Sequence, residues 1–419
     1  MFDIEPKILS VCQKAIKLCK EPFDKISGTT EYNQQKMLKA FIDSGVSESH
    51  FAGSTGYGYS DRGREVLDSV YAKAFEAEDA LVRHNLLSGT HAVSTALFGI
   101  LRPGDKILSI TGLPYDTIID VIGINKPSSG SLKEFGIEFE YIDLAKNGEL
   151  DYNAISSRLS GNSNFYKVIY IQRSKGYSFR NSISSHNIKK VTNLIKKLMP
   201  ESIILVDNCY GEFVEKQEPL KLGADLIVGS LIKNPGGGIA PCGGYIAGKK
   251  LLVEQCAYRL SAPGIGREIG ATLGHSRELF MGAFNAPHVV GEALKTAVFA
   301  SALFELLGYE VMPRYLDDRA DIVQAIKLGS PEALLSFCKG IQAGSPIDSM
   351  VAPEPWDMPG YDYPVVMAAG AFTQGASIEL SADATMKEPY TVWLQGGLNF
   401  HSAKIGILKA ADYLMKHRS

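Results

Sequence analysis

Between residues 80 and 248, short apolar runs alternate with amphipathic stretches, and this pattern is the strongest constraint on the fold. The apolar runs include KILSI (106–110), YKVIYI (166–171), IILV (203–206) and LIV (226–228). Alternation of this kind predicts a mostly parallel sheet with helices on both faces. The active sites of such sheets lie at the carboxyl ends of the strands. Polar residues at those ends are therefore the first candidates for chemistry.

The remaining segments predict an organisation in three parts. Residues 1–55 are typical of a helical arm, residues 56–289 hold the large sheet domain, and residues 290–419 predict a smaller α+β domain. In the smaller domain we expect strands near 365–369, 377–380 and 390–394, followed by a final helix. A chain of 419 residues fits two domains of ordinary size.

Composition excludes several functional classes. A net charge of −3 gives no electrostatic reason to expect nucleic acid or an anionic membrane as a partner. No apolar run approaches the roughly 18 residues of a spanning helix, and the first residues lack the apolar core of a signal peptide. The six cysteines and eight histidines show no disulfide or metal-ligand spacing, so we expect no metal. Together these features predict a cytoplasmic protein.

Two charged residues end successive apolar runs of the predicted sheet. The run LIVGSLIKNPGGG (226–238) carries Ser230 and Lys233, and Asp207 ends the preceding run. An amine and a carboxylate on successive strand ends suit pyridoxal phosphate (PLP). Lys233 would hold the cofactor as a Schiff base, and Asp207 would keep the pyridine nitrogen protonated, so that the ring accepts electrons. Alternatively, Asp207 caps a following helix.

A phosphate site is predicted where a helix begins after the first strand. Ser88, Gly89 and Thr90 open that helix, and backbone N–H groups at a helix N-terminus favour an anion. Ser230, three residues before Lys233, would add a hydroxyl. Taken alone, Ser88 equally fits a plain N-cap and Ser230 a polar strand end.

Three further residues are candidates at the same edge. Tyr115, on the turn TGLPYDT, would stack on the cofactor ring, although it also fits a half-buried turn residue. Tyr210 would donate to the phenolic oxygen of the ring. Arg173 follows another apolar run, and a phosphate, a substrate carboxylate and a surface acid all remain open as its partner.

Several motifs resemble one family. The runs SGTHAVSTALFGILRPGD, LVDNCY and SLIK are similar to the fold-type-I PLP enzymes, with the aspartate-aminotransferase-like fold, near the cystathionine and methionine lyases. The runs IQRSKGYSFR, DNCYGEF, SLIKNPGGGIAPCGGYI and ELSAD…EPYTVWLQGGL more closely resemble the bacterial aluminium-resistance, or methionine-γ-lyase-like, proteins along most of the chain. The resemblance implies a homodimer or homotetramer with shared active sites. It also implies that Tyr59 and Arg62 reach the phosphate across the subunit interface.

One departure from the family concerns the substrate. Cystathionine-type lyases carry a carboxylate-binding arginine on a C-terminal strand, and here Trp393 occupies that place. Lys387 or Arg173 would have to substitute. A lysine supplies charge without the two-point contact of a guanidinium.

The resemblance implies a PLP-dependent lyase that carries out β- or γ-elimination on a sulfur-containing amino acid, with Lys233 as the base for the α-proton. Two alternatives remain open. One is another PLP reaction, such as transamination or racemisation, because the fold does not choose among them. The other is a PLP-binding stress protein without turnover.

Overall fold

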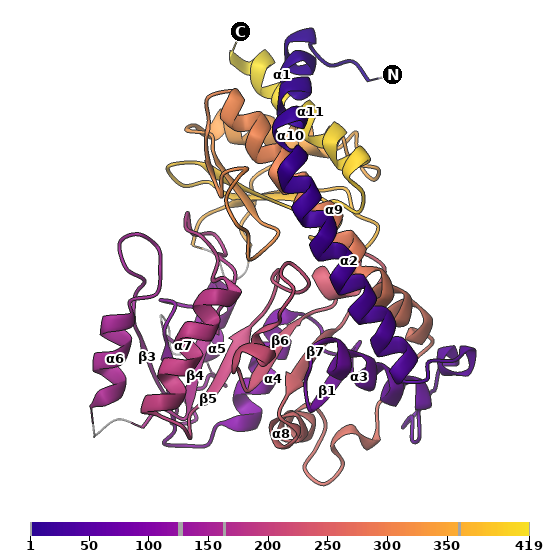
Figure 1. Cartoon of the computed structure of the whole chain (residues 1–419), viewed down its shortest axis with the longest axis vertical. Helices are drawn as coiled ribbons and strands as arrows, with labels where there is room; N and C mark the ends of the chain where they lie inside the picture. The colour runs from indigo at the N-terminus through magenta and orange to yellow at the C-terminus, as the bar shows by residue number, and fades with distance from the viewer. Residues whose placement is uncertain (1, 125–128, 162–164, 359–361, 419) are drawn as a thin grey trace.

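The computed structural model describes residues 2–124, 129–161, 165–358 and 362–418. The chain forms two lobes, each built on its own sheet (Figure 1). The long helix α9 (Ser276–Leu306) runs from the larger lobe into the smaller one. The predicted boundary at residues 289/290 falls inside this continuous helix, and the division into domains stays a prediction.

The large lobe contains a seven-stranded sheet in the order β1-β7-β6-β5-β4-β2-β3. Strand β7 is antiparallel to both of its neighbours, and the other pairs are parallel. The predicted mostly parallel sheet is therefore confirmed. The strands are β1 (Asp79–Arg83), β2 (Lys106–Ser109), β3 (Glu138–Tyr141), β4 (Val168–Gln172), β5 (Ile203–Asp207), β6 (Leu226–Ser230) and β7 (Gly244–Gly248).

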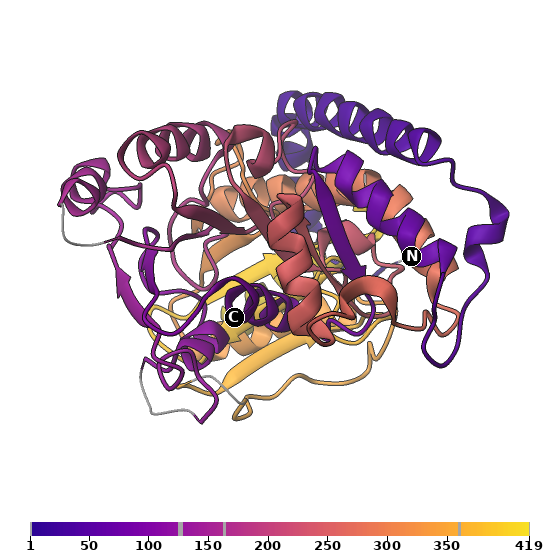
Figure 2. The ribbon, with the colours of Figure 1, turned by 90° about the horizontal axis from the view of Figure 1, so that it is seen from below.

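Helices cover both faces of this sheet because its central strands are apolar on both sides. Along β5, Ile204 and Val206 join the core on one face, whereas Ile203 and Leu205 join the core on the other. Figure 2 shows the helices on either side of the strands. The first core contains α3 (Arg62–Ala74), α6 (Tyr152–Ser160) and α7 (Ser185–Leu198), and the second contains α4 (Gly89–Ile100), α5 (Asp116–Ile122) and α8 (Lys250–Leu260).

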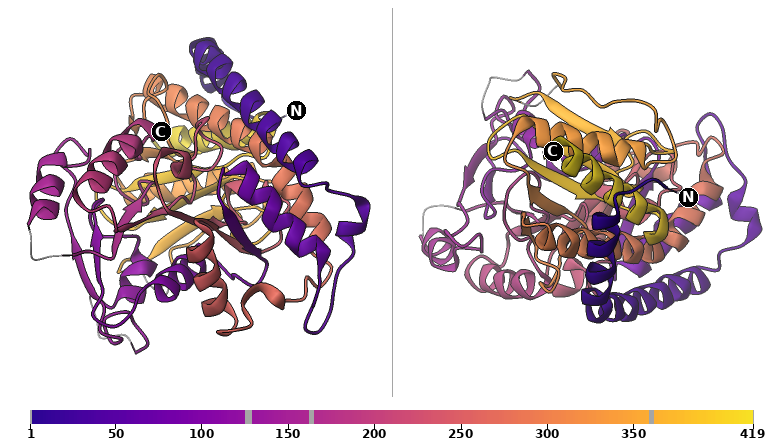
Figure 3. Two further views of the ribbon diagram at one scale, coloured as in Figure 1. Left: turned by 60° about the horizontal axis from the view of Figure 1, so that its bottom comes forward. Right: turned by 90° about the horizontal axis from the view of Figure 1, so that it is seen from above.

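The small lobe contains a five-stranded antiparallel sheet in the order β10-β11-β12-β9-β8. Helices α10 (Pro331–Ala343) and α11 (Phe400–Arg418) cover the face that points away from the large lobe (Figure 3). The strands are β8 (Glu310–Met312), β9 (Gln324–Lys327), β10 (Val365–Ala369), β11 (Ser381–Thr385) and β12 (Thr391–Gln395).

The expected strand at 377–380 is wrong, because the chain is still in a turn there and β11 starts at Ser381. The Glu379 carboxylate accepts the backbone N–H groups of Phe372 and Thr373, at 2.7 and 2.8 Å, and so stabilises the turn. The expected strands at 365–369 and 390–394 correspond to β10 and β12.

The N-terminal arm connects the two lobes. Helix α1 (Pro6–Leu18) buries Ile8 and Ala15 in the core of the small lobe. Helix α2 (Lys20–Asp43) lies along α9 and reaches the large lobe, where Met37 joins the core (Figure 1). In the part of the chain that the structure describes, no helix has the length and apolar character needed to cross a membrane.

Candidate active site

A pocket of about 170 Å³ opens at the carboxyl ends of β4, β5 and β6, against the N-terminus of α4. Eight of the residues predicted for the cofactor lie together in its wall: Ser88, Gly89, Thr90, Tyr115, Asp207, Tyr210, Ser230 and Lys233. Residues that the sequence did not single out complete the wall: Ile118, Gln172, Ser174, Gly176, Cys209 and Ile232. The sheet thus brings together side chains from segments far apart in sequence.

Lys233 follows β6 and extends into this pocket. Its Nζ atom lies 4.1 Å from the centre of the Tyr210 ring. Burial opposes the charge of the amine, but Cys209, Tyr210 and Asp207 together raise the pKa of Lys233 above its usual value. The chain then turns back tightly at Gly236, where a Cβ atom would lie 1.6 Å from the Leu231 carbonyl oxygen. Only glycine fits there, which explains the glycine run after the lysine.

Asp207 ends β5 and is almost fully buried. Its Oδ1 atom accepts the Cys209 N–H at 3.1 Å, and its Oδ2 atom accepts the Tyr170 hydroxyl at 3.3 Å. Turns and bends rather than a helix occupy residues 208–217, so Asp207 does not cap a helix. The carboxylate is thereby fixed in the pocket and can pair with a cation there.

The start of α4 has the features of a phosphate site. The Ser88 hydroxyl accepts the His91 N–H at 3.1 Å, so it caps the helix as the plainer interpretation expected. A Cβ atom on Gly89 would lie 3.1 Å from Cys209 Sγ and 3.9 Å from Lys233 Nζ, so glycine keeps this space open. The Ser230 hydroxyl is buried and has no hydrogen-bond partner among the described residues. An unpartnered buried hydroxyl beside a helix N-terminus fits a bound phosphate.

Tyr115 lies on the pocket wall directly before α5. Its backbone N–H donates to Gln172 Oε1 at 2.6 Å, which ties the turn to the end of β4. The ring packs 5.9 Å from the ring of Tyr177. Beside it, the hydroxyls of Thr90 on α4 and Thr117 on α5 lie 2.7 Å apart. Tyr115 is therefore placed where a planar cofactor ring could stack.

Arg173 points away from the pocket, although it directly follows β4. It is fully buried and forms an ion pair with Glu215 at 2.7 Å and a longer one with Glu218 at 3.6 Å. It also donates to Asn208 Oδ1 at 2.8 Å and to the Gly211 carbonyl at 2.9 Å. Of the three partners that the sequence left open, the structure shows an acidic one. Because the guanidinium is already paired, Arg173 does not reach a substrate carboxylate in this arrangement.

The other two substrate candidates differ in position. Lys387 is exposed, and its Nζ lies 4.8 Å from the ring centre of Tyr363. It does not line the pocket, although its charge acts on Asp116, the residue after Tyr115. Trp393 is buried on β12, with its ring 4.9 Å from that of Tyr177, and packs in a cluster that also contacts Tyr210. Trp393 therefore closes the pocket region from the small lobe.

Tyr59 and Arg62 do not line the pocket of their own chain. Tyr59 is exposed, and its ring stacks on that of Tyr57 with the ring centres 5.5 Å apart. Arg62 is also exposed, and its Nη2 atom lies 3.4 Å from His50 Nε2. Tyr59 lies on a loop that projects from the side of the large lobe, and Arg62 is the first residue of α3, which follows this loop (Figure 2). A contact with a neighbouring subunit stays a prediction.

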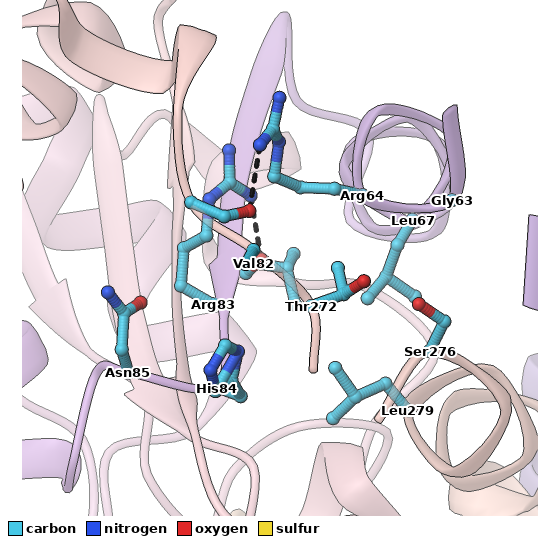
Figure 4. A pocket seen from close by; sticks show the side chains of 12 residues that line it. Gly63, Arg64, Leu67, Val82, Arg83, His84, Asn85, Thr272, Ser276 and Leu279 are labelled. Atoms are coloured by element: carbon cyan, nitrogen blue, oxygen red, sulfur yellow. Dashed lines mark hydrogen bonds between the residues drawn. The ribbon is translucent and has the colours of Figure 1, made fainter. Parts of the chain in front are cut away.

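A neighbouring arginine anchors this loop. Arg64 Nη1 donates to the carbonyl oxygens of Gly58 and Gly270, each at 2.8 Å. Figure 4 shows Arg64 beside a small cavity that it helps to line. The cavity beside it, lined by Leu67, Val82 and Thr272 among others, measures only about 10 Å³, room for about one water. The hydrogen bonds of Arg64 hold the loop in place, and the cavity is too small for a cofactor.

The sequence did not single out Asp383. It lies on β11, is 6% exposed, and its Oδ2 accepts Gln395 Nε2 at 2.5 Å. Burial raises the pKa of Asp383 to about 7, against the opposing effects of Gln395, Lys233 and Tyr177. Because Lys233 lowers the pKa of Asp383, the two groups lie close enough to interact electrostatically. The alternation of polar and small residues in the run ELSADAT (379–385) was the available signal.

The fold and the site define a class of protein. A mostly parallel sheet with a lysine, an aspartate and a phosphate-type helix start at its strand ends, joined to a smaller α+β lobe, is the arrangement of fold-type-I PLP enzymes.

Comparison with known proteins identifies the family. The chain matches the model of the methionine gamma-lyase family over residues 8–415, and it belongs to that family. It is 50% identical to a carbon-sulfur lyase involved in aluminum resistance from Clostridium novyi NT, with a TM-score of 0.94 and coverage of 98% of this chain and 96% of that one. It is 48% identical over 392 residues to the uncharacterized protein YnbB of Bacillus subtilis, which covers 93% of this chain and 92% of the relative.

A more distant relative is the L-methionine gamma-lyase of Pseudomonas putida, 27% identical over 236 residues, or 55% of this chain and 52% of the relative. The predicted family, the aspartate-aminotransferase-like fold and the class of PLP-dependent carbon–sulfur lyase are confirmed.

Proposed function

We propose that this lyase eliminates the sulfur substituent from the β- or γ-carbon of an amino acid. The observation that carries the proposal is the convergence of Lys233, Asp207 and the glycine-opened start of α4 in one pocket. For β-elimination, a cysteine thioether and one water yield a thiol, pyruvate and ammonium. For γ-elimination, a homocysteine thioether and one water yield a thiol, 2-oxobutyrate and ammonium.

Some pocket residues would hold the cofactor, and others would take part in the reaction. Backbone N–H groups of Gly89 and Thr90 and the Ser230 hydroxyl would hold the phosphate of PLP. Tyr115 would stack on the ring, and Asp207 would pair with its nitrogen. Bound PLP supplies the electron sink that stabilises negative charge on the α-carbon. We assign covalent attachment to Lys233, the lysine in the pocket wall.

Lys233 also serves as the base. Once substrate has displaced it, its amine takes the α-proton of the substrate. Asp207 is one of the groups that raise the pKa of Lys233, and its carboxylate favours the protonated amine that results. The same ammonium can then give its proton to the departing sulfur. Tyr210, whose ring lies against Nζ, positions the amine for both transfers.

For the substrate α-carboxylate we propose Arg180 in place of Arg173. Its two terminal nitrogens donate only to backbone carbonyls, those of Ser174 at 3.0 Å and Asn181 at 2.9 Å. Within the described parts of the chain no carboxylate lies in ion-pair range of it. Burial, which Asp321 offsets only in part, lowers the pKa of Arg180 to about 10. A desolvated guanidinium without a paired acid, bonded to a residue of the pocket wall, suits an incoming carboxylate.

The assembly we propose is a homodimer or homotetramer with shared sites. The exposed Tyr59 on the projecting loop and the exposed Arg62 that follows this loop support this arrangement, because neither serves the pocket of its own chain. We place the protein in the cytoplasm, a reducing compartment that suits its six unpaired cysteines.

A panel of amino acids tests the reaction. We expect cysteine or homocysteine thioethers to release thiol, 2-oxo acid and ammonia in equal amounts under steady-state conditions. Accumulation of the pyridoxamine form of the cofactor would instead indicate transamination. A spectral change without any product would indicate a binding protein and would overturn the proposal.

A further inference from the structure

A fully buried glutamate that the mechanism does not use lies close to the lysine of the pocket. Glu212 is in the turn that follows β5, and its side chain has no exposed surface. Asn234, the residue after Lys233, donates its Nδ2–H to the Glu212 carbonyl oxygen at 3.0 Å. A Cβ atom on Gly229 would lie 2.5 Å from Glu212 Oε1, so a glycine on β6 makes room for the carboxyl group. Glu212 therefore lies between the end of β5 and the turn that carries Lys233.

The carboxyl group of Glu212 has no cation in ion-pair range among the described residues. Its Oε1 atom accepts the Tyr245 hydroxyl at 2.8 Å, and its Oε2 atom is buried without a hydrogen-bond partner. By contrast, the buried carboxylate of Asp321 pairs with Lys175 at 2.9 Å. A buried carboxylate without a cation lowers stability, so a role in function is the better reason for this residue.

Titratable groups surround the Glu212 side chain. They are Tyr71 on α3, Cys209 and Glu218 in the same turn, Tyr245 on β7 and Lys233 after β6. Burial raises the pKa of Glu212 to about 8, and Glu218 adds to the increase. The backbone N–H of Glu212, the Tyr245 hydroxyl and Lys233 act in the opposite direction. The acid and the carboxylate are therefore both accessible near neutral pH.

Four groups raise the pKa of Lys233 against the effect of burial, and they are Cys209, Tyr210, Asp207 and Glu212. Burial raises the pKa of Cys209 and of Tyr210, so both stay neutral. Asp207 would be paired with the cofactor nitrogen. Glu212 is the remaining member of this set that can offer a negative charge to the amine.

We propose that Glu212 is a positioning residue of the reaction, whose carboxylate stabilises the ammonium that Lys233 becomes when it takes the α-proton. The inference rests on the proposed lyase function, because it concerns the base of that reaction. Ionised Glu212 makes Lys233 a stronger base. As the pH rises through about 8, Glu212 loses its own proton to solvent, and kcat should rise over the same interval.

Substitution of Glu212 tests the inference on the PLP-loaded enzyme. Glu212→Gln keeps the size of the side chain and an oxygen for the Tyr245 hydroxyl, but it carries no charge. We expect kcat to fall about tenfold at alkaline pH, the effect of about one unit in the pKa of the base, and KM to stay unchanged. The rise of kcat around pH 8 should disappear in this variant.

Stability separates this role from a structural one. Because burial raises the pKa of Glu212 in the folded chain, its ionisation destabilises the fold, and this effect grows as the pH rises from the ordinary value of a glutamate to about 8. Glu212→Gln should therefore be at least as stable as the wild type. Its advantage in melting temperature should increase over that pH range.

Glu218→Gln is the matched control. Glu218 is also buried in this turn, but it accepts the Phe213 N–H at 2.8 Å and pairs with Arg173. The control should lose stability and keep the rise of kcat, moved to lower pH because Glu218 raises the pKa of Glu212. Tyr245→Phe serves if Glu212→Gln fails to fold. It removes the hydroxyl that favours ionised Glu212 and should move the rise to higher pH.

Infrared difference spectroscopy measures Glu212 without turnover. The C=O band of a buried carboxylic acid should disappear with an apparent pKa of about 8 in the wild type, and it should be missing from Glu212→Gln at every pH. In Lys233→Ala the band should persist to higher pH, because Lys233 lowers the pKa of Glu212. An unchanged band in Lys233→Ala would show that the two groups do not interact and would overturn the inference.

Product release by Glu212→Gln with the kcat and the pH profile of the wild type would overturn the inference and leave the lyase function in place. Parallel loss of stability and activity in Glu212→Gln would make the residue structural and overturn it as well. A band that moves in Lys233→Ala, with no product from any amino acid, would overturn the lyase function instead, and the pairing of the two groups would stand.

Discussion

Substitution of Asp207 tests the catalytic assignment most directly, because the structure separates its charge from its hydrogen bonds. Asp207→Asn keeps an oxygen for the Cys209 N–H and can still bond with the Tyr170 hydroxyl, but it carries no charge. Asp207→Ala removes the charge and both bonds. The two variants should therefore agree in catalysis and differ in stability.

The expected magnitudes follow from these contacts. Loss of one partner of a buried ion pair costs about 3–5 kcal/mol, which corresponds to a fall in kcat/KM of roughly 150- to 5,000-fold in both variants. The two lost hydrogen bonds should lower the free energy of unfolding of Asp207→Ala by about 1–3 kcal/mol relative to the wild type. Asp207→Asn should stay within about 1 kcal/mol.

Thiol release and denaturant unfolding measure the two quantities, and absorbance of the bound cofactor reports how much PLP each variant keeps. Asp225 is a matched control, because it is a buried carboxylate at the opposite end of β6, bonded to Ile204 N at 2.8 Å. Asp225→Asn should lower stability and leave kcat/KM unchanged. An Asp207→Asn enzyme with near wild-type kcat/KM would refute the assignment of Asp207 to the cofactor.

Three further predictions concern the cofactor, the substrate and the assembly. Borohydride reduction and peptide mapping should place a pyridoxyl group on Lys233, and a label on Lys175 instead would overturn the site. Arg180→Gln should raise KM at least tenfold with a smaller change in kcat, because a two-point contact with a carboxylate is lost; an unchanged KM would exclude Arg180 as the carboxylate ligand. Arg62→Ala should weaken retention of PLP without unfolding the large lobe. Mixing Arg62→Ala with Lys233→Ala subunits should restore partial activity, and heterodimers that stay inactive would argue against shared sites.

The sequence alone predicted the large-lobe sheet and most of the pocket. Apolar runs long enough for one strand each, separated by amphipathic helices, leave few arrangements other than a parallel sheet. Because parallel strands present their carboxyl ends at one edge, the polar residues that follow them had to converge. Asp207, Ser230 and Lys233 could be grouped on that ground.

Only the tertiary structure shows whether the side chain of a strand-end residue points into the pocket or away from it. Gln172 and Arg173 are neighbours in sequence, yet Gln172 lines the pocket and Arg173 lies buried against Glu215. Successive residues of an extended chain point in opposite directions, and the sequence does not say which direction holds the pocket. Arg180 lies farther along, in the irregular segment between β4 and α7, where no strand pattern predicts the direction of its side chain.

The small lobe shows the limit more sharply. The sequence analysis missed β8, β9 and α10. The two strands have only three and four residues, too few for a periodic signal. Helix α10 does carry a signal, an N-cap at Ser330 followed by Pro331 and apolar residues at helical spacing, which was overlooked. The environment of Asp383 depends on contacts between segments that are far apart in sequence. Strand β11 pairs with β12, one face of their sheet points toward the large lobe, and Lys233 approaches from the end of β6. The sequence by itself determined which reactive groups lie at the carboxyl ends of the parallel strands. Packing between the lobes decided which of them face each other, because that packing depends on contacts between segments more than a hundred residues apart.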